Sequence, residues 1–444
     1  MNLLHYMRIR RVILPGLFAI FVLSVAQGRA FAWGNTWMGT ALEQMVTAAR
    51  WRAGAFKYNA AFRLDNAGYD SDIYFGMMAN PVPDYTITAG PDIQIFLPLK
   101  KKIVFDVSES PRYVFFFDTK RERALNNTFA GRVHLVFDRF YIQAGGGFIN
   151  AKQRLSTELN LNVRLKEDDL TGLVLWQASR ETSFALQYRR SEFRYENLTP
   201  GTFSFSENLN RRESFVNFTA YLQQRSKTRF YLDGEYGSFT FAEAISGFKD
   251  ARSYGIYGGI EFLPSSEGQG KTTSFSGRIN LGYRRLDVLS HGAKDYSGLV
   301  GNTDVSIGIM RFTAIRAFFS RGPQFSVYSG LTYYLQTIYG VGLAQSLSRK
   351  TTATYDFYYG RNEYPGGVTI GGEAIAKRLD KYMTHSIGLN FRLGRALELN
   401  LMANLGKRDS AFAPRPTSRR YFIGFSLTYG YPSGGFTMPR ARAF

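Results

Sequence analysis

The adjacent residues His385 and Ser386, in the stretch THSIGLNF, are the first candidates for nucleophilic chemistry. A serine nucleophile needs a histidine within hydrogen-bond reach and a third group that orients the ring. The stretch has the pattern of a β-strand, and adjacent residues on a strand point to opposite faces. The two side chains are therefore not expected to meet, and the sequence does not predict an enzyme.

Asn66, Asp70 and Asp72 lie close together in the sequence and could offer oxygen ligands to a cation. The same residue types bond their own backbone in turns, and we favour this second interpretation. The glycine run AGGGF, 144–148, lacks the lysine and the following helix of a phosphate-binding loop. Because the chain also has no cysteine and only four histidines, we expect no metal site and no cofactor.

Residues 1–32 have the features of an export signal. Basic residues precede the apolar run VILPGLFAIFVLSV, 12–25, and Ala30 to Ala32 form an A-x-A cleavage site. The alternative is an uncleaved anchor, but this apolar run is too short to span a bilayer. We therefore expect residues 1–32 to be removed after export across a bacterial-type inner membrane.

The remaining chain is dominated by alternating apolar and polar residues, as in YFIGFSLTYGY, 421–431. Aromatic residues make up 16% of the chain and there are 44 glycines, a composition that favours strands. A soluble β-sandwich also alternates, but its strands average about 5–6 residues. The alternating segments here run to roughly 10–14 residues, which is long enough to cross a membrane as tilted strands.

These strands must position any functional residue, so their architecture matters most. We predict an all-β protein, a closed antiparallel transmembrane β-barrel of the outer-membrane type with about 18 strands, range 16–20. The barrel is expected over 51–431, preceded by a periplasmic segment, 33–50, and followed by a periplasmic tail, 432–444. Short basic turns should be periplasmic and the longer polar connections extracellular. Apolar spacing over 38–50 predicts either a short helix in the barrel mouth or a plain leader into the first strand.

Two stretches carry a family resemblance. The strand 421–431 resembles the C-terminal assembly signal of outer-membrane barrels at Gly424, Leu427 and Tyr429, although Phe422 replaces the usual polar residue. The segment LDNAGYDSDIYFG, 64–76, with SESPRYVFFFDTKRERALNN, 108–127, resembles the putative β-barrel porin 2 family. That resemblance implies an outer-membrane barrel, and some members are linked with exopolysaccharide operons.

The polar parity of the strands predicts which side chains line the lumen. The pore-lining candidates are Lys57, Arg63, Arg132, Arg164, Arg189, Arg229, Arg278, Arg284, Arg392, Tyr257, Tyr328, Tyr334 and Tyr358. The basic members would favour anionic solutes, or would instead pair with acids across the lumen and keep it hydrated. The tyrosines would stack on sugars, pack against a plug or lie at the membrane interfaces.

The partner predictions follow from charge and location. The precursor carries a net charge of +20, and removal of residues 1–32 takes away four arginines and no acid, which leaves +16. We expect a location in the cell outer membrane, contact with outer-membrane lipid and lipopolysaccharide, and insertion by the barrel assembly machinery. Polysaccharide export components are candidate partners, whereas nucleic acid is disfavoured by location.

The function that we predict is a passage for polysaccharide or anionic solutes. A general diffusion porin is the first alternative, and a plugged structural or adhesion barrel is the second. An outer-membrane lipid hydrolase is the most distant one.

Overall fold

The computed structural model describes residues 36–432, apart from 101, 155–157, 159–160, 198–203, 226–227, 264–272, 291–292, 311, 329, 366–367, 371–372, 376–377 and 411–415. The expected export signal, 1–32, lies outside the described residues, as does 433–444 of the expected C-terminal tail. The domain boundaries therefore stay predictions.

Nearly all described elements are β-strands. The strands are β1 (Trp51–Ala53), β2 (Phe56–Asp70), β3 (Asp84–Leu99), β4 (Ile103–Glu109), β5 (Arg112–Phe116), β6 (Ala124–Val136), β7 (Phe140–Arg154), β8 (Asn162–Gln177), β9 (Thr182–Tyr195), β10 (Arg211–Arg225), β11 (Thr228–Phe241), β12 (Ala251–Phe262), β13 (Thr273–Val288), β14 (Tyr296–Ile309), β15 (Thr313–Phe325), β16 (Tyr333–Ser346), β17 (Thr351–Tyr364), β18 (Val368–Ile370), β19 (Glu373–Ile375), β20 (Arg378–Arg392), β21 (Leu397–Asp409) and β22 (Thr417–Gly430). The helices are α2 (Trp37–Ala48), α3 (Phe205–Leu209) and the 3₁₀ turns η1 (Lys120–Glu122) and η2 (Ala244–Lys249). None of the described helices is long and apolar enough to cross a membrane.

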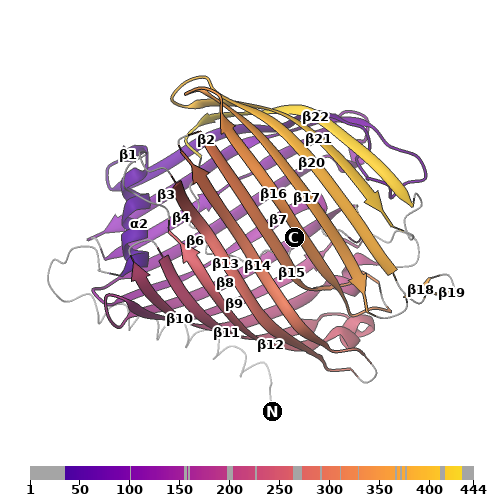
Figure 1. Ribbon diagram of the computed structural model, residues 1–444, viewed down its shortest axis with the longest axis horizontal. Coiled ribbons are helices and arrows are strands. Elements are labelled where there is room, and N and C mark those ends of the chain that lie inside the picture. The colour runs from indigo at the N-terminus through magenta and orange to yellow at the C-terminus, as the bar shows by residue number, and fades with distance from the viewer. Residues whose placement is uncertain are drawn as a thin grey trace, which may run out of the picture.

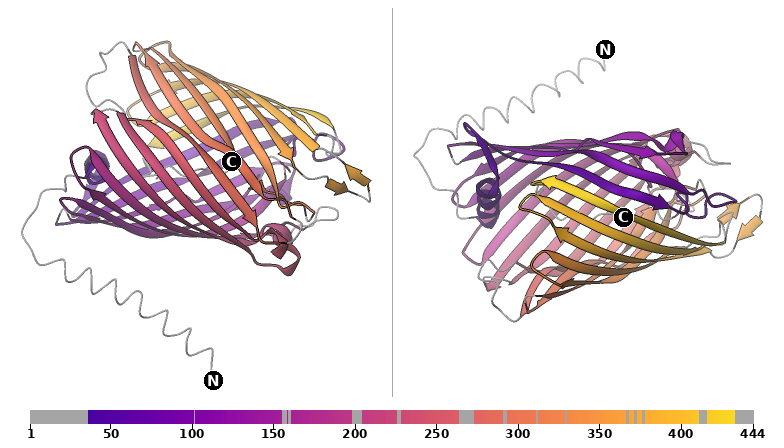
Figure 2. Two further views of the ribbon diagram at one scale, coloured as in Figure 1. Left: turned by 60° about the horizontal axis from the view of Figure 1, so that its bottom comes forward. Right: turned by 90° about the horizontal axis from the view of Figure 1, so that it is seen from above.

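The main sheet is antiparallel and closes on itself because β22 pairs with β2 (Figures 1 and 2). β4 and β5 form one interrupted strand between β3 and β6, broken at Ser110 and Pro111. Proline has no backbone N–H to donate to a ladder, so an interruption at this point is expected. Without the three-residue β1, eighteen strands of the described chain make the wall, which confirms the predicted barrel and its strand number.

The two ends of the barrel differ in their connections. At one end, which we call the short-turn end, neighbouring strands are joined by two to four residues, except for the ten residues of 263–272. At the other, the loop end, every connection has at least seven residues, and 196–210 has fifteen. β2 begins and β22 ends at the short-turn end, so both ends of the wall lie there.

The barrel closes at the seam between β2 and β22, and this seam accounts for residue types in the segments 64–76 and 421–431. Gly68 and Gly424 are direct partners across the seam, and a Cβ on Gly68 would lie 2.2 Å from the carbonyl oxygen of Ile423. Only glycine allows this close approach. Asn66, with a φ of 51°, forms a bulge beside them. At the loop end of the seam, Arg420 donates from Nε to Asp70 at 2.8 Å.

β22 covers only part of β2. Its ladder runs from Ala61 to Asp70 of β2 and leaves the first residues of that strand unpaired on this side. β1 folds back through a turn at Gly54, whose φ is 59°, and pairs with Phe56 to Tyr58. The short strand β1 thus completes the hydrogen bonding of β2 where β22 has ended.

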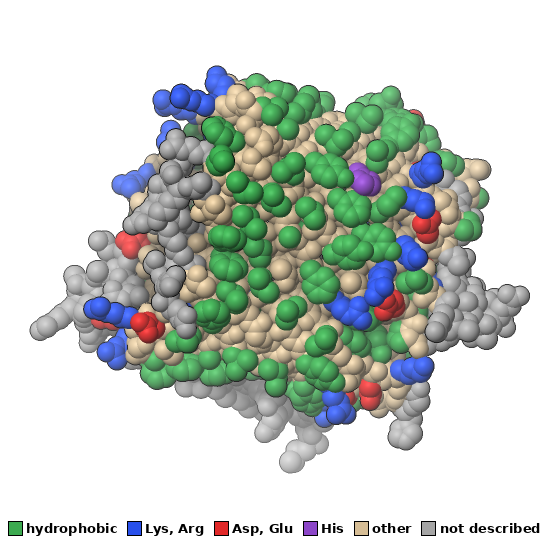
Figure 3. Space-filling model, viewed as in Figure 1, with side chains coloured by type: hydrophobic (Ala, Val, Ile, Leu, Met, Phe, Trp, Pro, Cys, Tyr) green, Lys and Arg blue, Asp and Glu red, His purple; other side chains and the backbone are tan. Residues whose placement is uncertain are grey.

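The outer surface of the wall is apolar. Leu232, Ile256 and Leu299 are 59%, 66% and 73% exposed. On the face shown in Figure 3, hydrophobic side chains form a broad green band over the strands. Each of the three residues alternates with residues that face the interior, because neighbouring residues on a strand point to opposite faces. In a lipid-embedded barrel this band contacts the acyl chains.

Helix α2 lies inside the short-turn end, as Figures 1 and 2 show. The helix begins at Trp37 because the Thr36 side chain accepts a hydrogen bond from Gly39 N. Met38, Leu42 and Val46 recur at helical spacing and are buried against the inner wall. The wall residues in this cluster are Phe96, Val104, Val136, Tyr141, Leu173, Leu175 and Ala185. Of the two open interpretations of 38–50, the helix in the mouth is the one observed.

Candidate functional site

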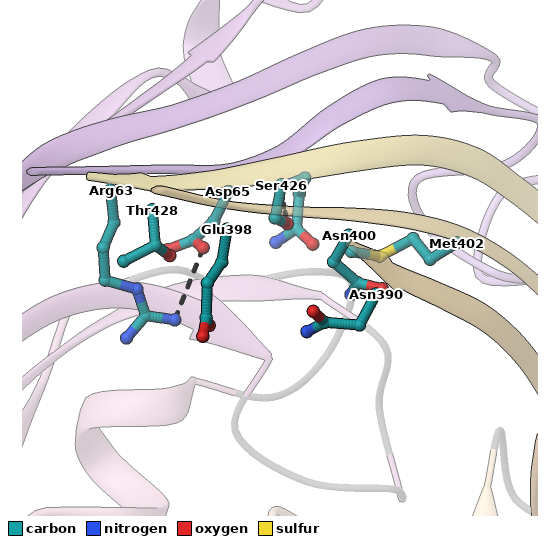
Figure 4. Close-up of a pocket in the computed structure, with 9 residues that line it drawn as sticks. Arg63, Asp65, Asn390, Glu398, Asn400, Met402, Ser426 and Thr428 are labelled. Carbon is teal, nitrogen blue, oxygen red and sulfur yellow. Dashed lines mark hydrogen bonds and ion pairs between the residues drawn. The ribbon is translucent and has the colours of Figure 1, made fainter. Parts of the chain in front are cut away.

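One wall of the lumen carries a polar ladder, which we define as Asn390, Asn400, Ser426, Glu398, Thr428 and Arg63 (Figure 4). Asn390, Asn400 and Ser426 are direct cross-strand partners on β20, β21 and β22. Next to them, Glu398, Thr428 and Arg63 align in the same way across β21, β22 and β2. The ladder lines a lumen cavity of about 490 Å³ together with Asp65, Asn66 and Met402. Amide, hydroxyl and carboxylate groups here present both donors and acceptors to a solute.

The predicted basic residues mostly form ion pairs with acids of the same strand or of nearby strands. The pairs are Arg63–Asp65 (3.4 Å), Arg132–Asp106 (3.4 Å), Arg229–Glu261 (3.3 Å), Arg278–Glu261 (3.7 Å), Arg284–Glu235 (3.9 Å) and Arg392–Glu398 (3.7 Å). Arg112 on β5 adds a further pair with Asp92 at 3.8 Å. Of the two predicted behaviours of these charges, their geometry fits local pairing better than a free basic lining.

Lys57 and Arg189 also lie on the inner face. Lys57 is opposite Phe96, which packs against α2, so it belongs to the short-turn end. The Arg189 guanidinium carbon lies 4.7 Å from the centre of the Phe215 ring. This contact is a cation–π interaction, which fixes the arginine against the wall.

Arg164 was predicted to line the pore, and the structure contradicts this. It lies on the same side of β8 as the exposed Leu170, Val174 and Trp176, and it donates to Asn150 Oδ1 at 2.9 Å. Strand parity assigns the apolar Val163 and Leu165 to the lipid face, whereas both are buried inside the loop end. Where loops fill a barrel mouth, apolar residues face inward, and parity alone then assigns the wrong face.

The four predicted tyrosines fall into two groups. Tyr257 and Tyr358 lie on the inner wall, where Tyr257 donates to Glu235 and Tyr358 packs 4.8 Å from Phe318 between ring centroids. Tyr334 is buried against Tyr364, and Tyr328 lies in the connection 326–332 rather than on a strand. The second group therefore packs within the loop end, as the plug alternative predicts.

The short-turn mouth contains polar contacts as well as the α2 cluster. The Arg229 guanidinium carbon lies 3.7 Å from the centre of the Trp37 ring, and the Trp37 ring meets Tyr221 edge-on at 5.8 Å. Arg229 is 2% exposed and also pairs with Glu261. Trp37, the first residue of α2, thus contacts β10 and β11, while the apolar stripe of the helix packs against β3, β4 and β6 to β9.

Segments from distant strands meet across the loop mouth, in a layer that we call the roof. Glu158, between β7 and β8, accepts hydrogen bonds from Ser326 Oγ (2.7 Å) and Val327 N (2.8 Å), between β15 and β16. Eight wall strands separate these two connections on one side and ten on the other. Arg408 of β21 donates to the Glu158 carbonyl at 2.8 Å. The roof therefore bridges nearly opposite sides of the barrel.

A lysine from a third connection completes the roof. Lys249 Nζ donates to the carbonyl oxygens of Ser326 (2.8 Å) and Asn208 (3.3 Å). An apolar layer lies alongside, with Ile73, Tyr74, Phe116, Leu161, Val163, Phe205, Leu209 and Val327. Arg378 and Asp380 form a buried ion pair at 2.6 Å on the adjoining wall.

Burial changes the proton affinity of two ionisable roof groups, Glu158 and Lys249. It raises the pKa of the Glu158 carboxyl, although Arg378 and the hydrogen bond from Val327 N oppose the rise. Burial lowers the pKa of Lys249 to about 7, and the nearby Glu158 limits this drop. The roof is thus built from groups that are costly to bury when charged.

The candidate chemical sites of the sequence have structural roles. His385 lies on the outer face, where its Nδ1 is 2.9 Å from the Tyr355 hydroxyl, and the next residue, Ser386, falls on the opposite face. Asp72 accepts hydrogen bonds from the backbone N–H groups of Tyr74 and Gly76, as expected of a turn residue. Among the described residues, no group of three or more His, Cys, Asp or Glu is arranged to hold a metal ion.

The three assembly-signal residues lie on β22. Gly424 faces the seam, and Tyr429 is 64% exposed on the outer surface. Leu427 has the same parity as Tyr429. Phe422, the departure from the pattern, is buried on the inner face, where the missing side chain of Gly424 leaves room for its ring. Recognition of these residues by an assembly machinery stays a prediction.

Sequence reasoning missed two sets of residues. The first set is the ladder amides Asn390 and Asn400, which lie on the same polar face as Arg392 and Glu398. The alternation of the strands would have placed them in the lumen, but a search for charged and aromatic residues passes over amides. The roof residues Lys249, Ser326 and Arg408 had no such signal, because their contacts join connections far apart in the sequence.

A closed eighteen-stranded barrel with an apolar outer band and a polar interior is the structure of an outer-membrane β-barrel of the porin type. The family model described as "Putative beta-barrel porin 2" matches residues 174–427, more than half of the chain. The protein belongs to this family, as the sequence predicts, and its location is the outer membrane. Outer-membrane barrels have short periplasmic turns, so the short-turn end is periplasmic and the loop end extracellular.

Comparison with curated proteins found no match. Among solved structures, OccAB2 of Acinetobacter baumannii is 10% identical, with a TM-score of 0.48, over 84% of this chain and 98% of that one. The outer-membrane protein opdK of Pseudomonas aeruginosa is 11% identical, also with a TM-score of 0.48, over 84% and 98%. The siderophore receptor PirA of Pseudomonas aeruginosa is 9% identical, with a TM-score of 0.43, over 84% and 80%.

Proposed function

We propose that the protein is a non-enzymatic channel that carries hydroxyl-rich solutes, with saccharides and polysaccharide as the solute class. The observation that supports this proposal is the polar ladder, which places two amides, two hydroxyls and a carboxylate on neighbouring strands of one wall. Sugar hydroxyls both donate and accept hydrogen bonds, and a continuous row of such partners lets a solute exchange one contact for the next.

The basic residues of the lumen support anion selectivity less strongly than the sequence alone suggests. A free basic lining would lower the entry cost of anions, but six of the predicted basic residues have a carboxylate within 4 Å. We therefore expect a weak preference between small anions and cations. A general diffusion porin would share this weak preference but would not bind saccharides.

A second candidate function is a plugged structural or adhesion barrel. It is favoured by one specific observation, namely that α2 fills part of one mouth while the roof bridges the other. The two candidates differ in a simple measurement, because a channel conducts ions across a planar bilayer and a plugged barrel does not.

The saccharide proposal is tested with the full mature protein in a planar bilayer. A linear gluco-oligosaccharide should block the current at lower concentration than a polyethylene glycol of similar size. Asn400→Leu should weaken this block about two- to tenfold, the value of a single hydrogen bond.

Asn302→Leu is the matched control, because Asn302 shares the inner parity of Asn280 on a different wall, outside the ladder cavity. It should leave the block unchanged. Equal block by the two polymers would reject saccharide selectivity, and a bilayer that stays silent with inserted protein would favour the plugged barrel.

A further inference from the structure

The outer surface of the wall carries a row of basic side chains at the loop end, which we call the basic row. It consists of Arg361 on β17, Lys381 on β20, Lys407 on β21 and Arg419 on β22. All four share the strand parity of exposed lipid-facing residues such as Ile387, Leu405 and Ile423. The Arg361 and Lys407 side chains are 43% and 36% exposed. In Figure 3, Lys and Arg side chains gather beyond the apolar band at this end of the face.

The register brings like charges together within the row. Arg361 is the direct partner of Lys381, and Lys407 is the direct partner of Arg419. Cβ atoms of such partners lie about 4.5–5.5 Å apart, and like charges at this distance destabilise a sheet. Two carboxylates lie among these four cations: Glu363 pairs with Arg361, and Asp409 pairs with Lys407 and is also the direct cross-strand partner of Lys381. The row therefore keeps a net positive charge that a bound anion would relieve.

A second charged region on the outer surface behaves differently. On β8, β9 and β10, basic and acidic side chains at the loop end pair between strands: Arg194 with Asp168, and Arg212 with Glu192 at 3.7 Å. Arg194 and Arg212 thus each have an acid on the neighbouring strand, so these two charges are compensated within the protein. The row thus differs from this region in having two directly opposed basic pairs, against the one pair Lys166 and Arg194 on β8 and β9.

The depth of the basic row identifies the anion. Two residues below Arg361 and Arg419 on the same face are Tyr359 and Tyr421. Tyr359 packs 5.2 Å from Tyr339, and Tyr421 lies 5.9 Å from Tyr69, between ring centroids. Exposed tyrosines in a belt mark the level where acyl chains meet headgroups. The row lies just beyond this belt, at the headgroups of the extracellular leaflet.

We propose that the basic row is a docking surface for the phosphate groups of lipopolysaccharide in the extracellular leaflet. Each like-charged pair would share a lipid A phosphate, which accepts hydrogen bonds from two cations at once. The tyrosine belt below would contact the first carbons of the acyl chains. This surface is separate from the lumen, so the proposal is independent of the solute that the channel carries.

The test uses the full mature protein in a non-ionic detergent, titrated with bis-phosphorylated lipid A in the same detergent. Lys381→Gln combined with Arg419→Gln removes one cation from each pair. Each lost cation near an anionic lipid surface should weaken binding about fivefold, and the double variant roughly 25-fold. The change should shrink as salt is raised, because the sites are exposed.

Arg194→Gln combined with Arg212→Gln is the matched control, with the same change in net charge on the other outer region. It should alter the apparent Kd less than about twofold. Lys381→Arg combined with Arg419→Lys retains the charges and should bind lipid A like the wild type. Loss of binding in this charge-retaining variant would overturn the proposal, and so would equal weakening in the control.

Two further titrations separate the sources of phosphate. Dephosphorylated lipid A should bind at least tenfold more weakly than the bis-phosphorylated form, as expected when two charge-assisted contacts are lost. Inorganic phosphate should fail to displace bound lipid A at equal concentration. Equal affinity for dephosphorylated lipid A, or displacement by inorganic phosphate, would show that the row is not a lipopolysaccharide site.

Discussion

The two mouths of the barrel are obstructed in opposite ways. At the short-turn end a single helix, α2, is held mainly by an apolar stripe in which Leu42 is fully buried. At the loop end, connections from several strands meet through hydrogen bonds to a buried carboxylate and a buried lysine. Apolar burial does not depend on protonation, whereas the cost of burying a charge does. We therefore predict that the short-turn mouth opens when α2 undocks and that closure of the loop mouth depends on pH.

The largest expected effect comes from weakening the helix. Leu42→Ala should destabilise the docked state of α2 by about 2–5 kcal/mol, the usual cost of emptying a buried leucine site. We expect a higher and noisier single-channel conductance as the helix leaves the mouth. Gln44→Ala, on an exposed position of the same helix, is the control. If Leu42→Ala conducts like the wild type, α2 does not limit passage.

The next effect comes from the roof carboxylate. Glu158→Ala removes the acceptor of Ser326 Oγ and Val327 N, and each donor left unsatisfied should cost about 1–3 kcal/mol. Chymotrypsin added to outer membranes should then cleave faster after Tyr328, which lies next to Val327. Glu243→Ala, at an exposed site of the same end, should not change the rate. Unchanged cleavage in Glu158→Ala would contradict the bridging role.

The pH dependence of the roof sharpens the comparison. The roof lowers the pKa of Lys249 from 10.5 to about 7, so the closed arrangement binds fewer protons than an open one between these values. Closure is therefore most favourable above pH 10.5 and weakens as the pH falls towards 7.

We expect channel opening events to become more frequent from pH 9.5 to pH 7, and this trend should disappear in Lys249→Met, which cannot be protonated there. The Leu42 variant should retain the trend, because the helix contacts do not titrate. A trend of the opposite sign would mean that Lys249 does not control the roof.

The smallest expected effect concerns the start of α2. Trp37→Leu removes the ring that faces the Arg229 guanidinium and should cost about 0.5–2 kcal/mol of helix docking. Trp37→Phe retains an aromatic face and should lose less. Open probability of the channel, compared among these variants, measures the difference. Identical values for Leu and Phe would assign the contact to simple burial.

Much of the fold could be predicted from the sequence because lipid imposes a strict rule on each strand. The alternation in 421–431 assigns Tyr421, Ile423 and Phe425 to one face, and all three are exposed on the outer surface. The rule fails where lipid is not the neighbour. Val163 is apolar yet faces inward, because the loop end supplies its own apolar layer, and Arg164 is misplaced as a result.

The candidate site was less predictable than the fold. The basic residues were found by their parity, but their partners were not, since Arg132 and Asp106 are brought together by register and not by spacing. The roof depends on Glu158 and Val327, which are 169 residues apart. No local pattern encodes such a contact. The lining roles of these residues stay predictions until conductance is measured.

The seam between β2 and β22 has a consequence for biogenesis. The first strand of the wall, β2, pairs with β3 on one side and gains its second neighbour only when β22 is in place, where Arg420 donates to Asp70. A chain that lacks its final strand would leave two strands of the wall unpaired at their edges. The backbone N–H and C=O groups of these edges would have no hydrogen-bond partner inside a bilayer. Only a chain that includes β22 can therefore close the barrel, so closure selects against truncated chains.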